Sequence, residues 1–255
     1  MKPLEIKHRV IGGGEPLICV PVVEQDAQSV IREITYLSQS TADMIEWRVD
    51  AFRDFTDYNA IRSVFEAVAP LLGEKLFLYT FRTAHQGGMA QVKAEQLDDL
   101  HDLAAESGCV DLVDLEFFEE DRPLHKIKRL REMGVSVIAS HHDFEQTPSP
   151  EVMKMLLEKM CAGGADIVNL AVMPQNYKDV LNLLDVTAQF REENPDTPVI
   201  TMSMGSLGGI SRISGETFGS CVTFGAHEKP SAPGQFAMKE LRQMLDTIHA
   251  SSQIQ

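Results

Sequence analysis

Eight short apolar runs recur along the chain, each closing in polar or charged residues, at intervals of 23 to 34 residues. Helical patterns separate them, and this alternation is typical of a (β/α)8 barrel, or TIM barrel, of the α/β class. The runs start at Leu17, Asp43, Leu76, Val110, Val135, Ala165, Pro198 and Cys221. In such barrels the carboxyl ends of the strands build the active site. We therefore expect any functional residues to follow these runs.

The size of the chain fits one domain of this kind. It has 255 residues, of which 44% are hydrophobic, and a complete barrel typically needs about 250 residues. A single barrel domain over residues 1–255 is therefore expected. The segment before Leu17, with glycines at 12–14, predicts a short N-terminal hairpin that closes the bottom of the barrel.

The charge of the chain excludes several classes of partner. A formal net charge of -15, from 23 basic and 38 acidic residues, argues against nucleic acid or an anionic membrane, since both require a broad basic face. No apolar stretch reaches the roughly 20 residues of a membrane span, and the N-terminal sequence lacks the apolar segment of a signal peptide. We expect a cytoplasmic protein that meets an anionic ligand with a local cluster of basic side chains.

Neither disulfides nor a metal site is expected. The four cysteines show no CxxC spacing, so buried free thiols are expected in a reducing cytosol. They are Cys19, Cys109, Cys161 and Cys221. His141 and His142 are adjacent on a strand and should point to opposite faces, so they cannot easily share a metal ion. No metal and no cofactor is predicted.

Charged side chains at several strand ends are candidates for a site. Glu46 and Arg48 are two apart in one strand and share a face, where a charged pair is costly unless it is used. The alternative is an ion pair that only fastens the rim. Arg82 and Arg212 follow the third and seventh runs, and two guanidinium groups at one rim make a carboxylate site plausible.

Three further features complete the predicted rim. His142 is the natural acid/base because its ordinary pKa is about 6.5, although a histidine at a strand end is often only packed and hydrogen-bonded. Glu116 and Asn169 end the fourth and sixth runs and should converge with it. The polar loop 225–236 after the last run predicts a lid over the barrel mouth, or else a plain surface loop.

Helical patterns are expected between the runs, for example in the segment that starts at Ser149 and Pro150. Its apolar side chains predict a buried stripe. The stripe comprises Val152, Met155, Leu156 and Met160.

Six motifs together resemble the type I 3-dehydroquinate dehydratase family, in order and over essentially the whole chain. The motifs are IEWRVD at 45–50, FRTA at 81–84 with GG at 87–88, SHHDF at 140–144, ADIV and AVMP within 165–174, ISRISGETFGS at 210–220 and SAPGQ at 231–235. The resemblance implies the same (β/α)8 fold, a cyclic hydroxy acid as ligand, no cofactor and a homodimer, which the family commonly forms.

The resemblance also implies a role for each matching position. His142 matches the general acid/base. The residues that resemble contacts to substrate hydroxyl and carboxyl groups are Glu46, Arg48 and Arg82. Those that resemble the carboxylate pocket and lid are Arg212, Ser231 and Gln235. Those that resemble the apolar lining under the ring are Met202, Met204 and Phe224.

Two positions depart from the family pattern. In the family, a lysine forms an imine with the ketone of 3-dehydroquinate, a histidine removes a neighbouring proton, and loss of water gives 3-dehydroshikimate. Here Asn169 stands at the lysine position, and a carboxamide nitrogen is not a nucleophile. Gln86 stands where the family has the glutamate that orients and charges the histidine, so His142 should be a weaker base.

The two departures conserve charge, because a cation and an anion are both replaced by neutral amides. Losing either one alone would leave a partly buried charge, at a cost of roughly 3 to 5 kcal/mol. The leading interpretation is a shikimate-pathway 3-dehydroquinate dehydratase homologue that keeps its substrate pocket, with dehydration lost or strongly reduced.

Other interpretations stay open. One is a lyase with a non-covalent mechanism based on His142, in which Asn169 serves as an oxyanion donor. Another is a non-catalytic binder or sensor of a cyclic hydroxy acid. A relocated imine on Lys229, in the expected lid, is a further alternative.

Overall fold

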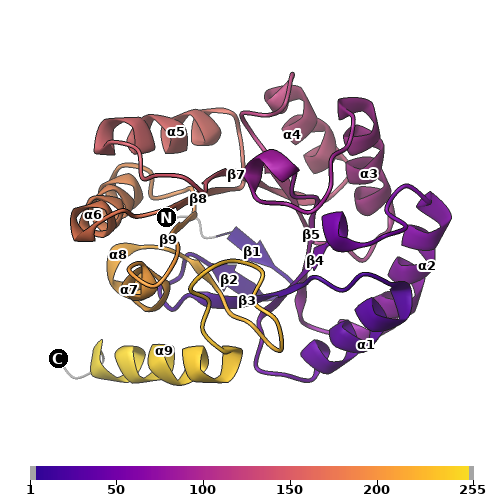
Figure 1. Ribbon diagram of the computed structural model, residues 1–255, viewed down its shortest axis with the longest axis horizontal. Helices are drawn as coiled ribbons and strands as arrows, with labels where there is room; N and C mark the ends of the chain where they lie inside the picture. The colour runs from indigo at the N-terminus through magenta and orange to yellow at the C-terminus, as the bar shows by residue number, and fades with distance from the viewer. Residues whose placement is uncertain (1–3, 253–255) are drawn as a thin grey trace.

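Eight parallel strands close into a barrel, with helices around the outside (Figure 1). This computed structural model describes residues 4–252. The hydrogen-bonded order is β10-β3-β4-β5-β6-β7-β8-β9. The backbone N–H of Cys221 donates to the Val199 carbonyl at 2.8 Å, which joins the β10 edge to β9 and closes the ring. The predicted (β/α)8 barrel is confirmed.

The predicted runs correspond to the barrel strands, each beginning within two residues of the expected start. The strands are β3 (Leu17–Val22), β4 (Met44–Arg48), β5 (Leu76–Thr80), β6 (Leu112–Glu116), β7 (Ser136–Asp143), β8 (Ile167–Val172), β9 (Val199–Ser203) and β10 (Val222–Phe224). A parallel sheet is buried on both faces, which explains why these strands read as nearly continuous apolar runs.

The connections between the strands are mostly helices. The α-helices are α1 (Ala27–Ser38), α2 (Tyr58–Val68), α3 (Ala94–Glu106), α4 (Pro123–Glu132), α5 (Pro150–Ala162), α6 (Tyr177–Glu193), α7 (Gly209–Ile213), α8 (Gly215–Phe218) and α9 (Met238–Ser252). The 3-10 helices are η1 (Val49–Ala51), η2 (Ala69–Leu71) and η3 (Ala84–Gln86). Between residues 4 and 252, no helix combines the length and apolar character needed to cross a membrane.

The predicted stripe of α5 is wrong in its register. The buried residues of this helix are Met153, Leu157 and Met160, whereas Val152 and Met155 are 40% and 39% exposed. Apolar residues occupy both of these faces of α5, so the sequence pattern does not decide between them. Packing of α5 against β7, β8 and α6 selects the face.

The four cysteines are all free. Cys19 and Cys221 are buried, while Cys109 and Cys161 are half-buried. The expectation of buried thiols therefore holds for two of the four.

A two-stranded hairpin closes the amino-terminal end of the barrel, as predicted. It consists of β1 (Leu4–Ile6) and β2 (Arg9–Ile11), which pair antiparallel. The tight turn is formed by Lys7 and His8, both with positive φ. The glycines at 12–14 instead connect the hairpin to β3. Ile11 is fully buried in the apolar cluster inside the barrel.

Three aspartates, each just before an alternate strand, stabilise the amino-terminal end of the barrel. Asp43, Asp111 and Asp166 precede β4, β6 and β8. Their carboxylates accept backbone N–H groups at the starts of β3, β5 and β7, from Ile18, Phe77 and Val137, at 2.8 to 2.9 Å. Two of them also hold the hairpin, because Lys7 pairs with Asp111 and Arg9 with Asp43, each at 2.8 Å.

We predict that Asp111→Ala lowers the free energy of unfolding by about 1 to 3 kcal/mol, since it leaves the N–H of Phe77 without its acceptor. Asp111→Asn keeps an acceptor oxygen and loses only the pair with Lys7, so it should cost less than about 1 kcal/mol. Urea unfolding followed by circular dichroism measures both. Equal losses in the two variants would contradict the assigned role of the backbone contact.

Candidate active site

A cavity of about 50 Å³ lies at the carboxyl end of the barrel. Side chains from the strand ends and from the loop after β10 line it. The polar lining residues are Glu46, Arg48, Arg82, Gln86, His142, Asn169, Ser231 and Gln235. The apolar ones include Met202, Met204, Phe224 and Phe144. The structure thus brings together every residue singled out as a substrate contact or acid/base except Arg212.

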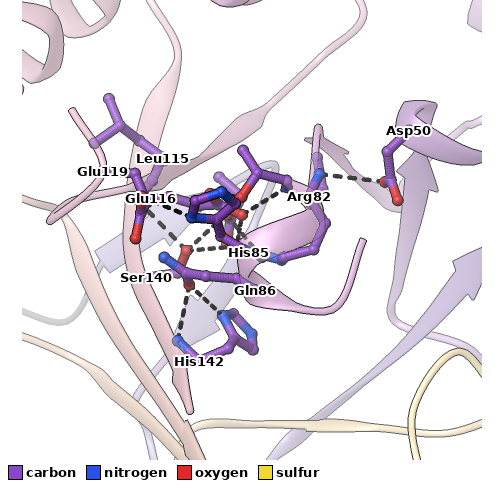
Figure 2. A network of polar contacts seen from close by, with 12 residues as sticks. Asp50, Arg82, His85, Gln86, Leu115, Glu116, Glu119, Ser140 and His142 are labelled. Carbon is purple, nitrogen blue, oxygen red and sulfur yellow. Dashed lines mark hydrogen bonds and ion pairs between the residues drawn. The ribbon is translucent and has the colours of Figure 1, made fainter. Parts of the chain in front are cut away.

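Arg82 is the centre of a buried polar network (Figure 2). Its Nη1 donates to Glu116 Oε1 and to Ser140 Oγ, both at 3.0 Å, and its Nη2 donates to Asp114 Oδ1 at 2.8 Å. Burial alone would lower the pKa of Arg82, but Asp114 and Glu116 outweigh it and raise the pKa above its ordinary value. Arg82 is therefore a fixed cation in the wall of the cavity.

Glu116 does not line the cavity, contrary to expectation. Its two carboxylate oxygens hold Arg82 and also accept from the N–H and the hydroxyl group of Thr83, at 2.9 and 2.7 Å. The alternation of acids in β6, at Asp114 and Glu116, is the sequence signal that could have revealed this supporting role.

Asp50 shapes the segment that follows β5. It forms a two-bonded ion pair with Arg48, at 2.8 Å for each bond, and accepts the backbone N–H groups of Arg82 and Met89. A Cβ at Gly88 would lie 1.8 Å from the carbonyl oxygen of Arg82, so the tight return of the chain requires glycine there. This folded segment carries Gln86 to the cavity.

Glu46 and Arg48 both face the cavity but do not pair with each other at hydrogen-bond distance. Arg48 pairs with Asp50, whereas Glu46 Oε1 accepts the hydroxyl of Thr80 at 2.7 Å. Burial raises the pKa of Glu46, and the nearby Arg48 only partly offsets it. Glu46 can therefore hold a proton more readily than an exposed glutamate.

Gln86 fixes the orientation of His142 (Figure 2). Gln86 Oε1 accepts the backbone N–H of His142 at 2.8 Å and lies 3.2 Å from its Nδ1. Because this oxygen only accepts, Nδ1 must carry the ring proton and Nε2 the lone pair. Burial, with Arg82 and Arg48, lowers the pKa of His142 well below its ordinary value. The arrangement is that of a neutral, weak base.

His141 points the other way, as predicted for adjacent strand residues. Its ring packs edge-on against Phe118, with centroids 5.4 Å apart, and it is not among the cavity residues. The two histidines therefore have separate surroundings.

The loop 225–236 lies over the cavity, in Figure 1 the gold segment across the middle of the barrel. Its base is closed because Ala226 N–H donates to the Phe236 carbonyl and Met238 N–H to that of Ala226. Within it, Gln235 bonds Ser231 through both its amide oxygen and its nitrogen. Both side chains reach the cavity, which supports the interpretation of this loop as a lid.

Arg212 is buried behind this loop and outside the cavity lining. Its Nη2 donates to the Pro233 carbonyl at 3.0 Å, while Nε and Nη1 have no partner within residues 4–252. Burial lowers the pKa of Arg212 to about 10. A buried guanidinium with two unused donor atoms is suited to an incoming carboxylate.

No lysine lines the cavity within the part of the chain that the structure describes. Lys178 is exposed on α6. Lys229 Nζ is paired with Glu24 at 2.9 Å on the exposed side of the lid. Neither amine lines the cavity.

A larger cleft, of about 320 Å³, lies between α3 and α4, away from the barrel mouth. Ion pairs of Lys126 with Asp98 and of Arg129 with Asp102 cross it. His101 at its floor is buried, and burial lowers its pKa to about 4. The cleft holds none of the barrel-mouth residues, so the cavity remains the candidate active site.

The fold and this site define a (β/α)8-barrel protein with a small polar cavity at the carboxyl ends of its strands. The sequence model of the type I 3-dehydroquinase family matches residues 18–252. The chain belongs to this family, the 3-dehydroquinate dehydratases of the shikimate pathway.

Relatives and solved structures agree over nearly the full length. The chain is 41% identical, over 98% of its length and 99% of the relative's, to the 3-dehydroquinate dehydratase of Syntrophotalea carbinolica. It superimposes on the type I 3-dehydroquinate dehydratase of Clostridium difficile, which carries covalently modified comenic acid, with a TM-score of 0.94 at 38% identity over 98% and 99% of the two chains. The 3-dehydroquinate dehydratase of Geobacillus kaustophilus superimposes with a TM-score of 0.95. The two sequences are 35% identical, over 99% of this chain and 98% of the other.

We predict that His142 stays neutral, with its proton on Nδ1, down to a pH well below 6.5, the usual value for histidine. Because the unfolded chain takes up this proton near pH 6.5 and the folded chain does not, the contribution of His142 to stability falls as pH drops through that range. Nitrogen-15 NMR of the imidazole measures the tautomer and the pKa.

Gln86→Glu places a carboxylate beside the same ring and should raise the pKa of His142. An ordinary or raised pKa in the unaltered protein would contradict the assigned environment.

Proposed function

We propose that this protein binds 3-dehydroquinate or a related cyclic hydroxy acid at the barrel mouth, with dehydration lost or strongly reduced. The observation that carries the proposal is a cavity with the polar groups of a family substrate site and with Asn169, rather than an amine, on β8. An amide nitrogen cannot attack a ketone, so the covalent route has no nucleophile there.

The proposed binding mode assigns a task to each wall of the cavity. Arg212, with two unused donor atoms, takes the ligand carboxylate as the lid loop shifts, and Ser231 and Gln235 cover it. Arg48, Arg82 and Glu46 contact the ring hydroxyls. Met202 and Phe224 pack under the ring. Because the loop 225–236 contributes Ser231, Ala232 and Gln235 to the cavity lining, we expect it to shift when a ligand enters.

A second candidate function is slow dehydration without an imine. The observation in its favour is the neutral His142, whose Nε2 is available as a base, together with the Asn169 amide as a hydrogen-bond donor to a developing enolate oxygen. One such donor is worth about 10²- to 10³-fold in rate in other enzymes. The rate should then be insensitive to borohydride.

The test combines binding and turnover. We expect calorimetric titration to detect binding of 3-dehydroquinate, and the ultraviolet absorbance of the conjugated enone product to rise little or not at all. Absence of binding at millimolar ligand would remove the proposal. Rapid turnover that borohydride abolishes would contradict the proposal, because it would show that another lysine forms the imine.

Arg212→Ala should weaken binding of the acid by at least about 2 kcal/mol, because the ligand carboxylate loses a buried cationic partner. Lys229→Ala is the matched control: it removes a cation from the same loop, but one paired with Glu24 outside the cavity. Calorimetry compares the two variants. A larger loss of binding affinity in the Lys229 variant would show that Arg212 is not the partner of the ligand carboxylate.

A further inference from the structure

Two side-chain amides in the cavity have polar atoms without partners. Gln86 is 2% exposed and Asn169 is 3% exposed. Gln86 Nε2 and Asn169 Oδ1 find no hydrogen-bond partner anywhere in residues 4–252. Buried polar atoms in folded proteins are nearly always paired, so these atoms indicate contacts that a ligand completes.

The orientation of Gln86 is fixed by its neighbour. Its Oε1 accepts the backbone N–H of His142 at 2.8 Å, and a backbone N–H can only donate. Exchanging the oxygen and nitrogen of the amide would bring two N–H groups together. The atom that Gln86 leaves for a ligand is therefore a donor, Nε2.

His142 adds an acceptor. Its Nδ1 shares the same Gln86 oxygen, at 3.2 Å, so the ring proton lies on Nδ1 and the lone pair on Nε2. His142 lines the cavity. A ligand atom that meets Nε2 must donate.

Asn169 contributes both kinds of site. Its strand neighbours in register are Ser140 on β7 and Ile200 on β9. The Ser140 hydroxyl already donates to Asp114 at 2.7 Å, and isoleucine has no polar side-chain atom. Neither neighbour therefore donates to the Asn169 oxygen, which has no hydrogen-bond partner within residues 4–252.

These sites together distinguish an alcohol from a ketone. A ketone oxygen accepts hydrogen bonds only, so it can meet the Asn169 amide N–H but gives no donor to the Asn169 oxygen. A hydroxyl group accepts from one amide and donates to an acceptor at the same time. Resting on the proposed function, we propose that the site selects a ring acid with a hydroxyl, rather than a ketone, at the carbon that faces Asn169.

The experiment compares two acids that differ at that carbon alone. Quinate carries a hydroxyl group where 3-dehydroquinate carries the ketone, and isothermal titration calorimetry gives both dissociation constants for the unaltered protein. We expect quinate to bind at least about tenfold more tightly, because a buried acceptor left without a donor weakens binding by that order. Equal binding, or tighter binding of the ketone, would overturn this inference while leaving the proposed function standing. Failure of both acids to bind would overturn the two together.

Variants at Asn169 locate the source of the preference. Asn169→Leu has a similar size and no polar atom, so the quinate preference should fall below about threefold, with folding checked by circular dichroism. A preference that survives in this variant would contradict the assignment to Asn169. Asn169→Lys places an amine there and should reverse the order, because the amine can condense with the ketone to an imine with loss of water. Added borohydride should reduce this imine to a stable secondary amine, detected as a mass adduct.

Discussion

The barrel mouth depends on one buried cation, Arg82. Three neighbours on β6 and β7 hold its guanidinium group, and the carboxylate of Asp50 holds its backbone N–H. Removing one partner of such a cluster would leave an uncompensated buried charge, at a cost of about 3 to 5 kcal/mol. The same cluster fixes the start of the segment that carries Gln86, and Gln86 in turn orients His142. Asn169 makes none of these contacts.

Two neutral amides, Gln86 and Asn169, can line the cavity because the contacts that hold Arg82 do not involve them. Gln86 supplies His142 with an acceptor oxygen that carries no negative charge. Asn169 is buried on β8, and its amide is not a nucleophile. Neither residue is part of the Arg82 cluster, and the chain as a whole superimposes on a type I 3-dehydroquinate dehydratase with a TM-score of 0.94.

The sequence predicts most of the fold because parallel barrel strands are buried on both faces and their apolar runs have clear ends. Polar residues at those ends, such as Asn169 and His142, are placed by topology alone. Side-chain partners are less predictable. Arg48 pairs with Asp50 rather than with Glu46, because the chain turns at η1 and places the Asp50 carboxylate beside the Arg48 guanidinium. Arg212 lies behind the lid rather than in the lining, which depends on loop packing that no periodicity encodes.

The central proposal is that the protein binds the family's substrate class while Asn169 and Gln86 keep it from catalysing dehydration efficiently. Its most direct test is the double variant Asn169→Lys, Gln86→Glu, incubated with 3-dehydroquinate, trapped with borohydride and weighed by intact-protein mass spectrometry, with product absorbance followed in parallel. The account predicts an adduct on residue 169 and new turnover, with neither in the unaltered protein. An adduct in the unaltered protein, or a folded double variant that forms none, would contradict it.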